Sequence, residues 1–117
     1  MRDHTKLTAF QLADDLAVAI YQSTRAFPKD ELYGLTSQMR RAAVSVPSNI
    51  VEGCARNSKA DYLRFLDIAF GSLRELEYQI TLAKRLHYLQ EPNSEELLDL
   101  AKQASKVLHG LIRSHRS

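Results

Sequence analysis

The stretch YLRFLDIAFGSLRELEYQITLA, residues 62 to 83, decides the fold because its apolar residues recur at alternating steps of four and three. This spacing puts one apolar stripe along an α-helix and is the seam pattern of a left-handed helical bundle. The helix is expected over residues 59–89, which makes it about 45 Å long. Its predicted buried residues are Tyr62, Leu66, Ala69, Leu73, Leu76, Ile80 and Ala83.

The rest of the chain has the same periodicity, and no segment alternates with period two over more than a few residues. Three more helices are expected, over residues 8–25, 36–57 and 94–114. Thr8 and Asn93 are predicted N-caps because each has a Gln or Glu three positions later, and Thr36 or Ser37 is expected to cap the middle helix. The predicted buried stripes are Phe10, Ala13, Ala17, Ile20 and Thr24; then Leu35, Met39, Ala42, Ala43, Val46 and Ile50; then Leu97, Ala101, Ala104, Leu108 and Leu111.

Four helices with short connections predict an all-α fold, an antiparallel up-down four-helix bundle. The length of 117 residues suits a single domain with one hydrophobic core. Hydrophobic residues make up 44% of the chain, yet no run approaches the roughly 20 apolar residues of a membrane span. The N-terminus lacks the pattern of a secretory signal, and the single Cys54 cannot form an internal disulfide. A cytoplasmic protein without membrane contact is therefore expected.

Pro47 lies inside the second expected helix, where it removes the amide that would bond the carbonyl of Ala43, at a cost of about 3 kcal/mol. Val44, Pro47 and Val51 form a stripe beside the expected core face. A kinked helix with an uncovered apolar stripe is typical of contact with another chain. We therefore expect self-association through this helix into a ring or barrel. Alternatively, Val44 and Val51 pack under the connection FPKDELYG, residues 27–34.

Gly53 and Gly71 also favour contact with another chain. Glycine costs about 1 kcal/mol inside a helix and is usually kept where another backbone comes close. Either glycine could instead mark a local break in its helix. Together with Asn49 and Glu52, they are assigned structural roles.

Residue spacing argues against an enzyme. The Glu-x-x-His pairs of a di-iron bundle are missing from the sequence, and one cysteine with four scattered histidines does not form a zinc set. Ser45 and Ser48 have no histidine at a neighbouring helical position, so they are expected to bond helix carbonyls near Pro47. Cys54 is expected to be a small core residue. No catalytic residue, metal or cofactor is predicted.

Glu52, Glu75 and Glu77 could be read as paired carboxylates for acid–base chemistry. Glu52, however, precedes Arg56 by four residues, and Arg74 lies next to the other two acids. Charge pairs on helix surfaces or between subunits explain these residues better.

Local basic clusters are the functional signal, because a formal net charge of +2 does not by itself indicate a nucleic-acid binder. Arginine suits phosphate because its planar guanidinium donates two hydrogen bonds at once. The basic residues from Lys102 onward are better explained by the helix dipole, because the last helix has acidic residues near its N-terminus and basic residues near its C-terminus. The predicted nucleic-acid-binding residues are Arg40, Arg41, Arg56, Lys59, Lys84 and Arg85.

Two long stretches resemble very closely the four-helix-bundle family of 23S rRNA intervening-sequence proteins. They are FPKDELYGLTSQMRRAAVSVPSNIVEG, residues 27–53, and ARNSKADYLRFLDIAFGSLRELEYQITLAKRL, residues 55–86. Arg40 and Arg41 stand at the family's paired-arginine position, while Val51 replaces a frequent alanine. The family's second pattern is matched by Pro47, Asn49, Glu52, Gly53, Arg56 and Ser58.

The resemblance implies a homopentamer in which five bundles form a barrel or funnel with a basic surface, and a ligand that is RNA or DNA. The family includes accessory proteins that bind the reverse transcriptase of diversity-generating retroelements, which implies such an enzyme as a further partner. A ring would also sum the weak attraction of each Arg40 and Arg41 for a polyanion. The predicted function is a non-enzymatic oligomeric scaffold that binds nucleic acid largely without sequence specificity. The alternative is a protein-binding adaptor or accessory subunit that does not touch nucleic acid.

Overall fold

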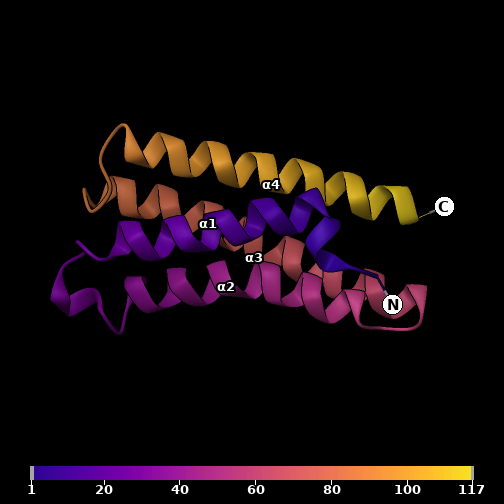
Figure 1. Ribbon diagram of the computed structural model, residues 1–117. Coiled ribbons are helices and arrows are strands. Elements are labelled where there is room, and N and C mark those ends of the chain that lie inside the picture. Colours follow the sequence, from indigo (N-terminus) through magenta and orange to yellow (C-terminus); the bar gives the residue numbers. More distant parts are fainter. Residues whose placement is uncertain (1, 117) are drawn as a thin grey trace.

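Over residues 2–116, four α-helices run alternately up and down to form an antiparallel bundle, as the sequence predicts (Figure 1). The computed structural model describes residues 2–116. The helices are α1 (Thr8–Thr24), α2 (Leu35–Cys54), α3 (Lys59–Arg85) and α4 (Asn93–His115), with short 3-10 helices η1 (His4–Lys6) and η2 (Lys29–Glu31). The bundle measures 43 × 24 × 20 Å, and its long dimension is close to the length of α3. None of the helices in this range has both the length and the apolar character needed to cross a membrane.

Each helix packs against the next one along the chain, and α4 closes the bundle against α1. Within residues 2–116, the diagonal pairs α1/α3 and α2/α4 bring no Cα atoms within 8 Å of each other, and they meet only through the side chains of the shared core. The most extensive contact joins α2 and α3, which lie side by side along most of α2. Surface grooves lie between α2 and α3 and between α3 and α4.

The apolar stripes of α2 and α3 are buried as predicted. All seven predicted α3 residues are essentially inaccessible to solvent, as are most of the six on α2. The predictions for α1 and α4 are partly wrong, because Phe10 and Leu111 are only half-buried. The core instead includes Ala9, Leu16 and Ile112. Positions next to the predicted stripe are also buried, because each helix packs against two neighbouring helices and its apolar face is wider than a single seam.

The stripe of Val44, Pro47 and Val51 is not uncovered as predicted. Pro47 is buried and Val51 is half-buried, while Val44 keeps 41% of its surface exposed. The N-terminal segment meets α2 as well: η1 contacts this helix, and the Arg2 amide donates to the carbonyl of Cys54, the last residue of α2, over 3.0 Å. The connection at residues 27–34 lies at the opposite end of α2, so the alternative prediction is also wrong for Val51.

The N-caps differ from the predicted ones. Helix α1 begins at Thr8 itself, and α4 begins at Asn93, so neither residue acts as a side-chain cap. Helix α2 begins after Gly34, and the Glu31 carboxylate, rather than Thr36 or Ser37, accepts a hydrogen bond from the Leu35 amide (3.1 Å). The cap of α2 therefore comes from the preceding connection.

Helix α3 ends four residues earlier than the predicted Leu89. His87 adopts a positive φ of 64°, and the Tyr88 amide reaches back to the Ala83 carbonyl over 2.9 Å, which is a Schellman-type termination. The Tyr88 ring lies 5.4 Å from that of Phe27, and Leu89 is buried. The chain after α3 thus packs onto the α1–α2 connection instead of continuing as a helix.

Candidate nucleic-acid interface

Arg40 joins α1 to α2. Its Nε donates to Thr24 Oγ1 over 2.9 Å, and its guanidinium lies 4.7 Å from the centre of the Tyr21 ring. Its Nη2 also approaches the Tyr21 carbonyl at 3.4 Å. These contacts use two of the five guanidinium N–H groups and tie Arg40 to α1, so Arg40 also has a packing role.

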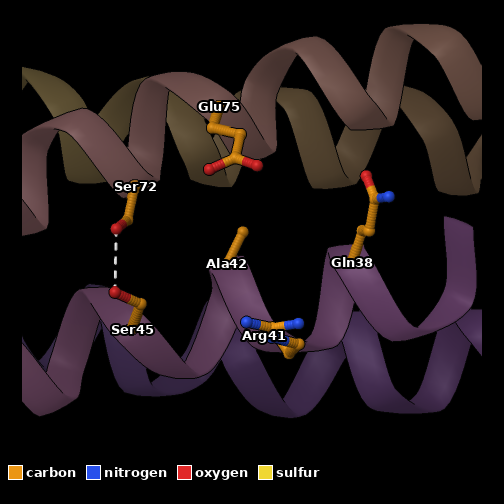
Figure 2. Close-up of a pocket in the computed structure, with 6 residues that line it drawn as sticks. All are labelled: Gln38, Arg41, Ala42, Ser45, Ser72 and Glu75. Atoms are coloured by element: carbon orange, nitrogen blue, oxygen red, sulfur yellow. Dashed lines mark hydrogen bonds between the residues drawn. The ribbon is translucent and has the colours of Figure 1, made fainter.

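Arg41 lies on a different face of α2, because successive residues on a helix are rotated by about 100°. It opens into a groove of about 380 Å³ between α2 and α3 and forms no ion pair within residues 2–116. Figure 2 shows the Arg41 guanidinium beside α2 and the Glu75 carboxylate reaching down from α3. The groove is lined by Gln38, Arg41, Ala42, Ser45, Ser72 and Glu75.

Hydroxyl and carboxylate groups of this groove are held by their neighbours. The Ser45 and Ser72 hydroxyls share a hydrogen bond of 2.8 Å across the groove (Figure 2), and Glu75 accepts from Gln79 over 3.1 Å. Ser45 therefore bonds across to α3 and not to a helix carbonyl as predicted. Asn49 takes that role, donating to the Ser45 carbonyl over 2.8 Å. The sequence did not reveal the pairing with Ser72, because it depends on the register between α2 and α3.

Arg56 and Lys59 lie at the junction of α2 and α3. Arg56 pairs with Glu52 over 3.0 Å, as the four-residue spacing predicts, and its guanidinium lies over the Phe65 ring at 4.6 Å. Lys59 is exposed in the first turn of α3 and has no ion pair within the described residues. Lys59 has no carboxylate partner within the described residues, whereas the Arg56 guanidinium is shared with Glu52.

Lys84 and Arg85 lie at the far end of α3, about 38 to 39 Å from Lys59 at the helical rise. Lys84 approaches Glu91 at 3.4 Å, whereas Arg85 is exposed and forms no ion pair within residues 2–116. The six predicted basic residues therefore do not form one cluster on a single subunit.

Of Glu52, Glu75 and Glu77, two pair with basic residues as expected. Glu77 approaches Arg74 at 3.5 Å, so both Glu52 and Glu77 have basic partners, whereas Glu75 is bound by Gln79. Cys54 is buried as predicted, and its burial raises the pKa of the thiol, which is therefore protonated at neutral pH. Residues 2–116 contain no group of three or more His, Cys, Asp or Glu side chains that could hold a metal ion.

The two glycines have different surroundings. A Cβ at Gly53 would lie 3.0 Å from Phe65 Cβ and 3.2 Å from the Tyr62 carbonyl, so α3 approaches α2 closely there. A Cβ at Gly71 would meet nothing within 4 Å. The close approach predicted for Gly53 is present, and that predicted for Gly71 is missing from the described subunit.

The comparison with known families matches residues 5–110 to the model of the 23S rRNA-intervening sequence protein. The chain belongs to this family. Among solved structures, a protein of unknown function from the S23 ribosomal protein family of Bacteroides thetaiotaomicron VPI-5482 shares its fold. The TM-score is 0.82 at 24% identity, and the match covers 90% of this chain and 95% of that one. No curated protein matches the chain.

In this member of the family, residues of the second pattern hold the α2–α3 junction together. Asn49 bonds the α2 backbone, Gly53 lets α3 come close, and Arg56 pairs with Glu52. Ser58 is the N-cap of α3, its hydroxyl accepting from the Asp61 amide over 3.1 Å. These four residues of the family's second pattern and Ser58 therefore have architectural roles.

Proposed function

We propose that this chain is a non-enzymatic scaffold that binds RNA or DNA through phosphate contacts, largely without sequence specificity. The supporting observation is Arg41, whose guanidinium is exposed in the α2–α3 groove with no carboxylate partner within residues 2–116. Lys59 and Arg85 are exposed in the same way. Unpaired cations at a surface attract a polyanion, since each phosphate contact releases condensed counterions.

We further propose that the protein acts as an oligomer of this chain, as the family resemblance implies with its homopentamer. One subunit with a formal charge of +2 offers a weak field, and copies arranged around an axis would add their fields together. The surface that suits this contact combines Val18, Tyr21 and Val44, which are exposed apolar residues of α1 and α2. This surface replaces the predicted stripe of Val44, Pro47 and Val51.

A protein-binding adaptor is the second candidate. It is favoured by the contacts of Arg40, Arg56 and Lys84, which are occupied by groups of the same subunit and so are poorly placed for phosphate. The family's accessory proteins suggest a reverse transcriptase as the kind of partner such an adaptor would serve.

Binding of labelled single-stranded RNA and duplex DNA, measured from about 50 to about 200 mM salt, separates the two candidates. A scaffold gives a log affinity that falls linearly with log salt, and Arg41→Ala reduces this slope by about one per bound subunit. Arg40→Ala is the matched control and leaves the slope unchanged, because its guanidinium is bound to Thr24 and Tyr21. Absent or salt-independent binding would instead support the adaptor.

A further inference from the structure

A row of basic residues follows the exposed face of α4. Lys102, Lys106, His109 and Arg113 are spaced by four, three and four residues, so they share one side of the helix. All four are exposed, and the row is about 17 Å long. Neither lysine forms an ion pair within residues 2–116.

The helix dipole does not account for the whole row. Its effect is confined to about the last turn of a helix, and α4 ends at His115. Arg113 lies in that turn, but Lys106 is more than two turns before the end and Lys102 more than three. The helix dipole therefore favours Arg113 but does not reach the two lysines.

These lysines face a groove between α3 and α4. Two adjoining hollows of about 320 and 270 Å³ share Arg74, Glu77 and Lys102, which makes the groove continuous over both. Phe70 lies at one end, with its ring 5.6 Å from that of His109. Tyr78 lies at the other end with 62% of its surface exposed.

The charge inside this groove is predominantly positive. Arg74, Lys102 and Lys106 are opposed by Glu77 alone among the residues that line it. Glu77 approaches Arg74 at 3.5 Å through Oε2, while its Oε1 is buried with no hydrogen-bond partner in the part of the chain described. The Glu77 side chain is only 16% exposed, whereas Arg74 is 63% exposed and reaches solvent.

We infer that the α3–α4 groove binds one strand of nucleic acid, with phosphates on Arg74, Lys102 and Lys106 and a base stacked on Tyr78. This inference rests on the proposed function and gives it a site distinct from the Arg41 groove. Neighbouring helix axes lie about 8–10 Å apart, so the groove between them suits a single strand better than a duplex. A basic track with exposed aromatic rings is the combination by which proteins hold unpaired strands.

The test compares Lys102→Ala/Lys106→Ala with Lys6→Ala/Lys29→Ala, which removes the same charge from exposed lysines outside the groove. Binding of a labelled single-stranded RNA to the full chain is measured over a salt series, and circular dichroism checks that each variant is folded. We expect the groove variant to bind about tenfold or more weaker, with the salt slope reduced by about two, and the control to stay close to the wild type.

Two further variants test the parts of the site separately. Tyr78→Ala should weaken single-strand binding by about tenfold without changing the salt slope, because stacking releases no counterions. Glu77→Gln should tighten binding, since it removes the only negative charge of the groove lining and frees Arg74. Duplex DNA of equal length should bind less tightly than the single strand and respond little to Tyr78→Ala.

Several results would overturn the inference. If the wild type binds nucleic acid and Arg41→Ala weakens it while the groove variant matches its lysine control, the proposed function stands and the groove is not the site. If the groove variant loses duplex and single-strand binding equally, the strand preference is wrong. If poly-glutamate displaces the RNA at equal charge concentration, the groove takes acidic peptides instead. If the wild type binds no nucleic acid, the proposed function fails with it.

Discussion

Arg40 and Arg41 are chemically identical neighbours with different environments. The rotation of about 100° per residue turns Arg40 toward α1, where it bonds Thr24 and lies over Tyr21, and turns Arg41 toward the groove with α3. The sequence predicted the pair as one basic site, since it shows that two arginines are adjacent but not which donors are occupied. At the scale of the residue, environment and not identity decides which arginine is free.

Gly53 and Gly71 provide a matched pair for testing a close helix approach. Gly53→Ala should destabilise the protein by about 1–2 kcal/mol, because the new Cβ meets Phe65 and the Tyr62 carbonyl and the helices must move apart. Gly71→Ala should stabilise it by up to about 1 kcal/mol, because alanine favours the helix and meets nothing within 4 Å. Urea unfolding at one protein concentration measures both. Equal stability of the two variants would mean that α3 does not press on Gly53.

At the scale of the element, the ends of the helices are set by contacts between connections. Glu31 joins three parts of the chain: it caps α2 through the Leu35 amide, and its other oxygen accepts from the Tyr88 hydroxyl over 2.8 Å. Tyr88 and Leu89 are held against Phe27 and the core, where α3 would otherwise continue. This explains why a locally helical sequence at residues 86–89 does not extend α3.

Replacing Glu31 should have an effect that depends on pH. The hydrogen bond from the Leu35 amide, and secondly that from Tyr88, lower the pKa of Glu31 below its ordinary value, and the Glu31 bond raises the pKa of Tyr88. A carboxylate with a lowered folded-state pKa stabilises the fold above its unfolded pKa of about 4.3, and this stabilisation is lost as the pH falls through the folded pKa.

Glu31→Gln should therefore lower the melting temperature at neutral pH, and its difference from the wild type should shrink at pH values below about 4. Thermal unfolding followed by circular dichroism from about pH 7 to about pH 3 measures this difference, in which the other carboxyl groups largely cancel. A difference that stays constant over the whole range would show that the Glu31 charge does not stabilise the fold.

At the scale of the whole molecule, assembly and binding are coupled in the proposed function. A subunit exposes Val18, Tyr21 and Val44 along neighbouring helices, and Tyr21 is further fixed by Arg40. Covering these apolar residues with a second copy would stabilise an oligomer. The unpaired basic side chains of each subunit would then be repeated around the symmetry axis. The surface groove of one subunit would then become one of several identical sites.

Val44→Asp should reduce the mass of the oligomer to that of a single subunit in light scattering, because it places a charge in an apolar contact. Leu86→Asp is the matched control, since Leu86 is similarly exposed but lies beyond the end of α3. Val51→Asp would not test assembly cleanly, because Val51 is half-buried and a charge there would also destabilise the fold of the subunit. A wild type that is already a single subunit, or a Val44→Asp variant of unchanged mass, would contradict this account of assembly.

The sequence by itself determined the four helices, their antiparallel order and most of the core, because burial of apolar residues imposes a local period that can be read directly. It also indicated the Arg56–Glu52 pair, which lies within one helix. The tertiary structure decided where the helices end, that Pro47 is buried, and which basic side chains are free. The helix ends and the free basic residues depend on the register between segments far apart in the chain, such as Tyr88 against Glu31 and Thr24 against Arg40. No local period carries that register, because it is set by how whole helices pack together.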